Sequence, residues 1–259
     1  MRRLLLLALL LLCPFVTDAQ QNTIVVVSAG GAYSDIRLWM NFEDCGVPPC
    51  TAYTIGSDEY TRGDITITFN NGAGLRLVAV LDGSVGLDIN AAGPDYAELD
   101  VAADDLVNPI EGRIGMKFQY AATTTGNPLI FNARSSDSAT RFRLELGAGG
   151  TSLRARWDDG TNDTTSGSTS TLSTTTEYCI ELTYDATSDT FDILVDSTEE
   201  DVTWAGSMLD TGVPNIAVLE FGNSLPSDTG AIYLDTIAIS DSATRDLCAL
   251  FAISEDYPG

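Results

Sequence analysis

The chain has 259 residues, with 13 basic and 37 acidic side chains, a formal net charge of −24 and no histidine. A surface this acidic repels nucleic acid and anionic membranes, so we expect neither as a partner. The lack of histidine excludes Ser-His-Asp and Cys-His catalytic triads and most zinc chemistry. An enzyme of this sequence would have to use carboxylates, tyrosine, arginine or a hard metal.

The first 19 residues predict a secretory signal peptide. Arg2 and Arg3 precede a leucine-rich run over residues 4–12, and Ala19 follows as a suitable cleavage site. The run is too short to span a bilayer, and no later stretch of the sequence resembles a membrane helix. We therefore expect a secreted protein in which residues 20–259 form one domain, with a short C-terminal extension from about residue 241.

Short segments in which apolar and polar residues alternate predict an all-β domain. In chain order, we expect strands at residues 24–27, 36–42, 64–69, 75–81, 96–101, 113–119, 141–146, 153–157, 177–184, 190–196, 216–221 and 231–240. A Ser/Thr/Gly-rich stretch over residues 161–176 predicts a long loop, and residues 242–253 predict a short helix. The last strand changes phase at Asp235 and Thr236, which is typical of a β-bulge. Short strands separated by turn signals favour an antiparallel two-sheet jelly-roll sandwich.

The central part of the chain concentrates positive charge. Between positions 113 and 156, only Asp137 and Glu145 are acidic. The basic residues of this stretch are Arg113, Lys117, Arg134, Arg141, Arg143, Arg154 and Arg156. A glycine-rich turn at residues 147–150 would place Arg143 beside Arg154 and Arg141 beside Arg156. Like charges opposed across two strands are destabilising, so either nearby carboxylates or an anionic ligand must neutralise them.

The order of several segments resembles the laminin-G-like, concanavalin A-like jelly rolls of secreted proteins. These segments are LWMNFED at residues 38–44, AELDV at 97–101, EGRIGMKFQY at 111–120, RFRLEL at 141–146 and IYLDTIAISD at 232–241. The resemblance implies that the polar face of the central strands is concave and binds glycans. It also implies a structural calcium ion, held by Glu43 or Asp44 and by Asp235 through carboxylate oxygens. The superfamily contains lectins, adhesion modules, glycanases and polysaccharide lyases, so the fold alone does not fix the function.

We predict a non-catalytic carbohydrate-binding or adhesion protein whose arginine-rich face binds a polysaccharide or glycoconjugate, with an acidic polysaccharide as the best fit. Trp204 is the candidate for stacking against a sugar ring. Two alternatives stay open: a polysaccharide lyase or glycoside hydrolase acting in the same groove, and a structural surface protein without a ligand. Glu98 and Asp100 faintly resemble a glucanase motif, but Ala103 stands where its acid/base belongs and the segment has no convincing second carboxylate.

Four cysteines follow the signal peptide, and an even number in an oxidising compartment predicts two disulfides. A bond between Cys45 and Cys50 would close a tight loop and leave Cys179 to pair with Cys248. The two other connectivities stay open on the sequence alone. A zinc site is the weak rival, because the Cys-x4-Cys spacing is unusual and no histidine is available.

Overall fold

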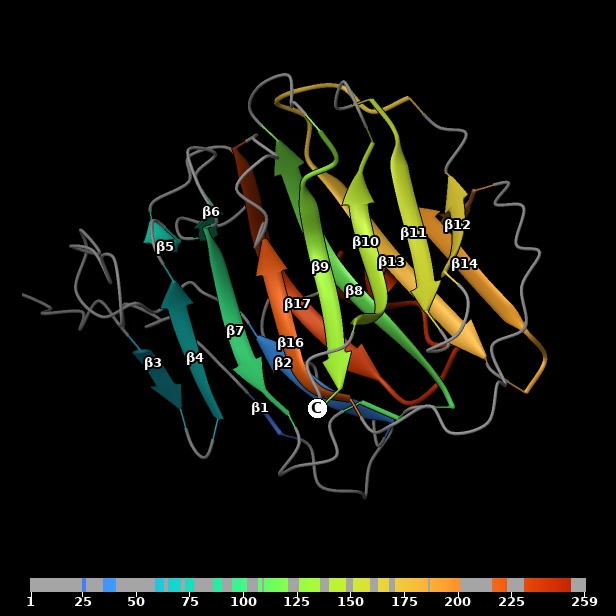
Figure 1. Ribbon diagram of the computed structural model, residues 1–259, viewed down its shortest axis with the longest axis horizontal. Coiled ribbons are helices and arrows are strands. Elements are labelled where there is room, and N and C mark those ends of the chain that lie inside the picture. Colours follow the sequence, from blue (N-terminus) through green and yellow to red (C-terminus); the bar gives the residue numbers. More distant parts are fainter. Residues whose placement is uncertain are drawn as a thin grey trace, which may run out of the picture.

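The computed structural model describes residues 25–26, 35–40, 59–62, 65–70, 73–76, 86–89, 95–101, 107–108, 110–120, 126–135, 140–147, 151–158, 163–167, 171–185, 187–200, 216–222 and 231–252. These residues form two antiparallel sheets packed face to face, with one short helix (Figure 1). The predicted all-β, two-sheet jelly-roll sandwich is therefore confirmed. The predicted signal peptide lies outside the described residues. Within the described ranges, no helix has the length and apolar character needed to cross a membrane.

The nine-stranded sheet is built around the longest strand, β8. Its main path runs through β1 (Val25–Val26), β2 (Ile36–Met40), β17 (Ile232–Ser240), β8 (Glu111–Tyr120), β13 (Tyr178–Asp185), β14 (Thr190–Val195) and β15 (Thr198–Glu199). Strand β6 (Gly86–Ile89) pairs with β17 and carries β5 (Gly74–Arg76). The predicted β-bulge is confirmed in β17, where the pairing with β8 shifts between Asp235 and Ile237. Thr236, inside the bulge, has a positive φ of 41°.

The eight-stranded sheet covers the opposite side of the core. Its order is β12 (Asp163–Gly167), β11 (Leu153–Asp158), β10 (Thr140–Leu146), β9 (Leu129–Ser135), β16 (Ile216–Gly222), β7 (Tyr96–Asp100), β4 (Ile65–Asn70) and β3 (Glu59–Arg62). Strand β12 lies inside the stretch predicted to be a loop, so that prediction is wrong over residues 163–167. Its threonines are β-branched and fit a strand at the edge of a sheet.

Alternating side chains from both sheets fill the space between them. Phe142 and Trp157, which face each other across β10 and β11, stack with ring centroids 5.5 Å apart. Tyr184 and Phe191 of the opposite sheet close around this pair. Each fully buried large side chain contributes about 1.5–3 kcal/mol to folding. The outer faces of the two sheets therefore remain for polar residues and for any function.

The predicted C-terminal helix is shorter than expected. Helix α1 spans Leu247–Phe251 and lies against the outer face of the nine-stranded sheet. Its buried side chains belong to a small apolar cluster separate from the core between the sheets.

Candidate functional site

The outer face of the eight-stranded sheet carries a row of polar residues that oppose one another directly, strand by strand. From β4 to β11 the row consists of Thr68, Glu98, Glu220, Asn132, Arg143 and Arg156. The row is acidic on β7 and β16 and basic on β10 and β11. It arises because each of these residues alternates with a buried neighbour, such as Phe142 and Leu144 on either side of Arg143.

At the basic end, three arginines converge on one carboxylate, that of Glu145. The nearest contact is between Arg143 Nε and Glu145 Oε1, at 2.5 Å. Arg156 Nη1 lies 3.9 Å from Glu145 Oε1, and Arg154 Nε lies 4.0 Å from Glu145 Oε2. The Glu145 side chain is only 5% exposed, whereas those of the arginines are between 19% and 34% exposed. These four side chains therefore carry three positive charges against one negative charge, and the positive ones reach solvent. We call them the arginine cluster.

At the acidic end, a fourth arginine is held by two carboxylates. Arg134 Nη2 lies 2.6 Å from Glu98 Oε2, and Arg134 Nε lies 3.2 Å from Glu220 Oε2. Glu220 is buried, so its charge needs this partner. Burial raises the pKa of Tyr96, and the nearby carboxylates Glu98 and Glu220 raise it further. The Arg134 guanidinium is thus neutralised within the protein.

Asn132 lies between the acidic and basic ends of the row. It is 4% exposed, and its Oδ1 accepts no hydrogen bond from the described residues. A buried acceptor without a donor costs about 1–3 kcal/mol. The row therefore keeps an unsatisfied polar group at its centre, next to Arg143.

Not all of the predicted basic residues share this face. Arg113 and Lys117 lie on β8 in the nine-stranded sheet, because the chain crosses to the other sheet between β8 and β9. Both are buried, and Arg113 Nη1 pairs with Glu181 Oε1 at 3.2 Å. The expected single face of seven basic residues is therefore corrected to one with Arg134, Arg143, Arg154 and Arg156. Arg141 lies in β10, but its side chain is outside what the structure describes.

The register of the central hairpin also differs from the predicted one. Gly147 N donates to Ser152 O at 2.7 Å, which closes the loop later than the predicted turn. Arg143 therefore opposes Arg156, and Glu145 opposes Arg154. This register pairs two buried leucines at the end of the hairpin, Leu146 of β10 and Leu153 of β11. The shift of two residues leaves every side chain on its predicted face but brings Glu145 among the arginines.

Several other predicted site residues lie outside the described residues: Glu43, Asp44, Cys45, Cys50 and Trp204. Asp235 is described and is buried within the bulge, where its Oδ1 accepts a hydrogen bond from Thr236 N at 2.7 Å. Lys117, the only lysine of the chain, opposes it directly on β8. Among the described residues, no group of three or more cysteine and acidic side chains is arranged to hold a metal ion. The calcium site therefore stays a prediction.

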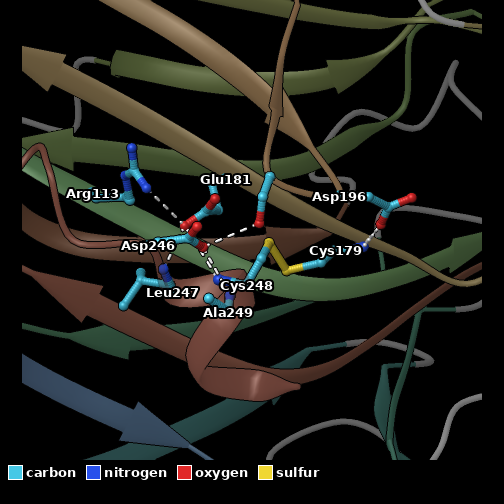
Figure 2. The surroundings of a disulfide bond; sticks show 9 residues. Arg113, Cys179, Glu181, Asp196, Asp246, Leu247, Cys248 and Ala249 are labelled. Atoms are coloured by element: carbon cyan, nitrogen blue, oxygen red, sulfur yellow. Dashed lines mark hydrogen bonds and ion pairs between the residues drawn. A yellow bond between two sulfur atoms is a disulfide. The ribbon is translucent and has the colours of Figure 1, made fainter. Parts of the chain in front are cut away.

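The predicted bond between Cys179 and Cys248 is confirmed. It joins the second residue of β13 to α1, across 69 residues of sequence (Figure 2). Beside it, Glu181 Oε1 accepts hydrogen bonds from Leu247 N at 2.7 Å and from Cys248 N at 3.3 Å. The disulfide and Glu181 together fasten the helix to the sheet.

Sequence reasoning missed Glu220 and Glu181 as partners of the arginines. Each alternates with buried residues on its strand, as Glu220 does between Leu219 and Phe221. A carboxylate next to buried apolar residues was an available signal that a cation lies opposite. Which cation lies opposite such a carboxylate depends on the order of the strands in the sheet, and the sequence alone does not reveal that order.

Comparison with known proteins finds similarity in structure but not in sequence. No protein family matches the sequence, and no curated protein matches it. The binding domain of botulinum neurotoxin serotype D superposes with a TM-score of 0.58 at 10% identity, over 85% of this chain and 52% of that one. The serotype D ligand-binding domain in complex with N-acetylneuraminic acid gives 0.55 at 7% identity, over 76% and 46%.

A structure of botulinum neurotoxin type C, whose cell entry depends on interaction with two ganglioside molecules, gives a TM-score of 0.54 at 8% identity, over 78% of this chain and 48% of that one. The chain thus spans about half the length of these structures. At this level of identity, the likeness shows the β-sandwich fold alone.

Proposed function

We propose that this protein is a secreted, non-catalytic carbohydrate-binding protein that binds carboxylated glycans through the outer face of the eight-stranded sheet. The arginine cluster provides the charge, and Asn132 provides a neighbouring polar group. Guanidinium groups bind carboxylates through two parallel hydrogen bonds, so sialic acid and uronic acids are the sugar classes that fit.

The observation that carries the proposal is the imbalance around Glu145. One carboxylate faces three guanidinium groups, two of them about 4 Å away, while the whole chain has a net charge of −24. Like charges gathered on adjacent strands cost free energy that a bound anion would recover. The structural neighbours add support of a coarser kind, because one of them was determined with N-acetylneuraminic acid and another is associated with gangliosides.

The test is a pair of single substitutions that remove the same charge from different faces. Arg156→Gln removes a guanidinium of the arginine cluster, whereas Arg37→Gln removes one paired with Asp241 on the nine-stranded sheet. We expect R156Q to weaken binding of sialyl-oligosaccharides or oligogalacturonate by about tenfold or more, since a charged hydrogen bond is worth about 1.5–3 kcal/mol. R37Q should bind the oligosaccharide with the affinity of the wild type. Added salt should weaken the binding of the oligosaccharide by R37Q and by the wild type.

Isothermal titration calorimetry measures both variants directly. Equal binding by R156Q and the wild type would contradict the proposed site. Binding of neutral and carboxylated oligosaccharides with the same affinity would contradict the proposed class of ligand.

A second candidate function is glycoside hydrolysis, which the pairing of Glu98 with Glu220 favours. The two residues oppose each other across β7 and β16, which supplies the second carboxylate that the sequence did not reveal. The Cβ atoms of residues opposed in this way lie about 4.5–5.5 Å apart, and a retaining glycosidase needs two carboxyl groups about 5–5.5 Å apart. Arg134, however, forms ion pairs with both carboxylates, so neither is free to act as the proton donor that such an enzyme needs. Binding is therefore the function that the geometry supports better.

The enzymatic alternative predicts release of reducing ends from an oligosaccharide, and loss of that release in Glu98→Gln. A screen of the wild-type protein against uronate-containing polysaccharides and neutral β-glucans decides whether the protein is a hydrolase. No release by the wild type, together with binding that depends on Arg156, would leave the non-catalytic function alone.

A further inference from the structure

The segment that follows β17 forms a cover on the outer face of the nine-stranded sheet. We call residues 241–252 the C-terminal cover. Its helix contributes Leu247, Leu250 and Phe251 to an apolar cluster whose other members, Ile36, Trp39 and Ala238, belong to the sheet. The ring of Phe251 meets that of Trp39 edge-on, with centroids 5.1 Å apart. This cluster is separate from the core between the sheets, so the contacts of the cover are not part of that core.

Helix α1 depends on the sheet for its stability. It has five residues, fewer than an isolated helix needs in water. Two of its first N–H groups are satisfied by Glu181, whose carboxylate also pairs with Arg113, as Figure 2 shows. A third is satisfied by Asp246, whose Oδ1 accepts from Ala249 N at 2.8 Å. Every one of these contacts is non-covalent.

The helix also sits directly on the backbone of β8. A Cβ atom added to Gly115 would lie 2.9 Å from Leu247 Cβ, closer than real side chains approach.

Two ion pairs and one disulfide also hold the cover. Nearer β17, Arg245 Nε donates to Asp35 Oδ2 at 2.6 Å, and Arg37 pairs with Asp241. These last two ion pairs are partly exposed, and such pairs contribute little to stability. Apart from the main chain that joins it to β17, the bond between Cys179 and Cys248 is the covalent link between the cover and the sheet among the residues described.

The cover forms one wall of a pocket. The pocket has a volume of about 320 Å³ and lies over β13, β14 and β15. Ala243 and Thr244 line it from the cover, and Thr183 Oγ1 donates to Ala243 O at 3.1 Å to hold that wall in place. Asp192 and Glu199 line it from β14 and β15. Removing the cover would therefore dismantle the pocket as well as expose Trp39.

We propose that the Cys179–Cys248 disulfide is a latch: when a dithiol reductant breaks it, the C-terminal cover leaves the nine-stranded sheet, opening the pocket and uncovering Trp39, while the sandwich stays folded. The sulfur–sulfur bond is exchanged for two cysteine thiols. The dithiol supplies two electrons and two protons and becomes a disulfide itself. Cys179 is partly exposed and Cys248 is buried, so the attacking thiolate would approach the bond from the side of Cys179.

Trypsin reports on the latch at one informative position. Arg245 is the last basic residue of the chain and lies within the cover, where its guanidinium pairs with Asp35. Cleavage after it separates residues 246–259, which mass spectrometry identifies. The full chain is compared as Cys179→Ser/Cys248→Ser and as Cys45→Ser/Cys50→Ser, the latter being the control for loss of cysteines elsewhere.

We expect cleavage at Arg245 to be at least tenfold faster in C179S/C248S than in the control, with an unchanged β-sheet circular dichroism spectrum. The fluorescence of Trp39, assigned by comparison with Trp39→Phe, should shift to longer wavelength. Wild-type protein that is folded first and then treated with dithiothreitol should behave as C179S/C248S does, which keeps the test decisive if that variant does not fold.

Two results would overturn the proposal. Cleavage at Arg245 within twofold of the control would show that the cover stays docked without the disulfide. Loss of the β-sheet spectrum on reduction of the folded wild type would show that the disulfide clamps the whole fold. Gly115→Ala provides an independent check, since it crowds Leu247 without changing a cysteine, and in the C179S/C248S background it should speed cleavage further.

Discussion

Replacing Glu145 by glutamine tests whether the arginine cluster is an electrostatically strained surface. The substitution keeps the shape of the side chain but leaves Arg143, Arg154 and Arg156 without the carboxylate on which they converge. Removing one partner of a buried ion pair costs about 3–5 kcal/mol. The arginines are 19% to 34% exposed, so water screens part of the repulsion, and we take the lower end, about 3 kcal/mol. For a domain of this size, that lowers the melting temperature by about 6–12 °C.

The assay is thermal and urea unfolding of E145Q with and without a carboxylated oligosaccharide. If an anion occupies the cluster, it should stabilise E145Q more than the wild type, because it replaces the lost negative charge. Glu98→Gln is the matched control: Glu98 is 36% exposed, and its partner Arg134 retains Glu220, so we expect a loss below about 1 kcal/mol. Equal losses in E145Q and E98Q would refute the view that the charges around Glu145 are imbalanced.

Three further predictions concern the nine-stranded sheet. Removing the disulfide as C179S/C248S should lower the free energy of unfolding by about 4 kcal/mol, because the bond closes a loop of 69 residues in the unfolded chain; urea titration measures it. Burial raises the pKa of Glu181 above its ordinary 4.5, with the Arg113 guanidinium opposing the shift. Ionising Glu181 therefore costs stability, and the unfolding free energy of the wild type relative to E181Q should be highest below pH 4.5 and fall as pH rises past that value; equal pH profiles would contradict this. The predicted calcium site requires calcium-dependent melting that Asp235→Ala abolishes, and an unchanged melting temperature at millimolar calcium would reject it.

The sequence predicted most of the longer strands because burial on one face imposes a period of two, which the side chains record directly. It predicted the bulge at Asp235 for the same reason, since an extra residue reverses the phase. It did not predict β9, which carries Asn132 and Arg134, or the short strands β3, β6 and β15. The edge strand β12 was missed because its Ser/Thr/Gly composition carries no apolar alternation. Its pairing with β11 comes from the neighbouring strand rather than from its own residues.

The candidate site was predicted only in part, because alternation assigns a residue to a side of its strand but not to a sheet. Arg113 and Arg143 both alternate with buried residues, yet they lie on opposite faces of the sandwich. The partners of the arginines come from far along the chain: Glu98 precedes Arg134 by 36 residues, and Glu181 follows Arg113 by 68. Such pairs follow from the order of strands in each sheet, which depends on how loops close rather than on local sequence.

The outer faces of the two sheets both carry charged residues, but the chain covers these residues on only one of the two faces. Each sheet buries one face in the core and leaves a polar face with charges that need partners. On the nine-stranded sheet, the C-terminal cover lies over the ion pair of Arg113 and Glu181, whose side chains are 10% and 0% exposed. On the eight-stranded sheet, Arg154 and Arg156 are 34% and 26% exposed around the carboxylate of Glu145. The chain covers the charged residues of one outer face with its own C-terminal segment and leaves those of the other exposed, and this difference is the reason for proposing a ligand site on the eight-stranded sheet.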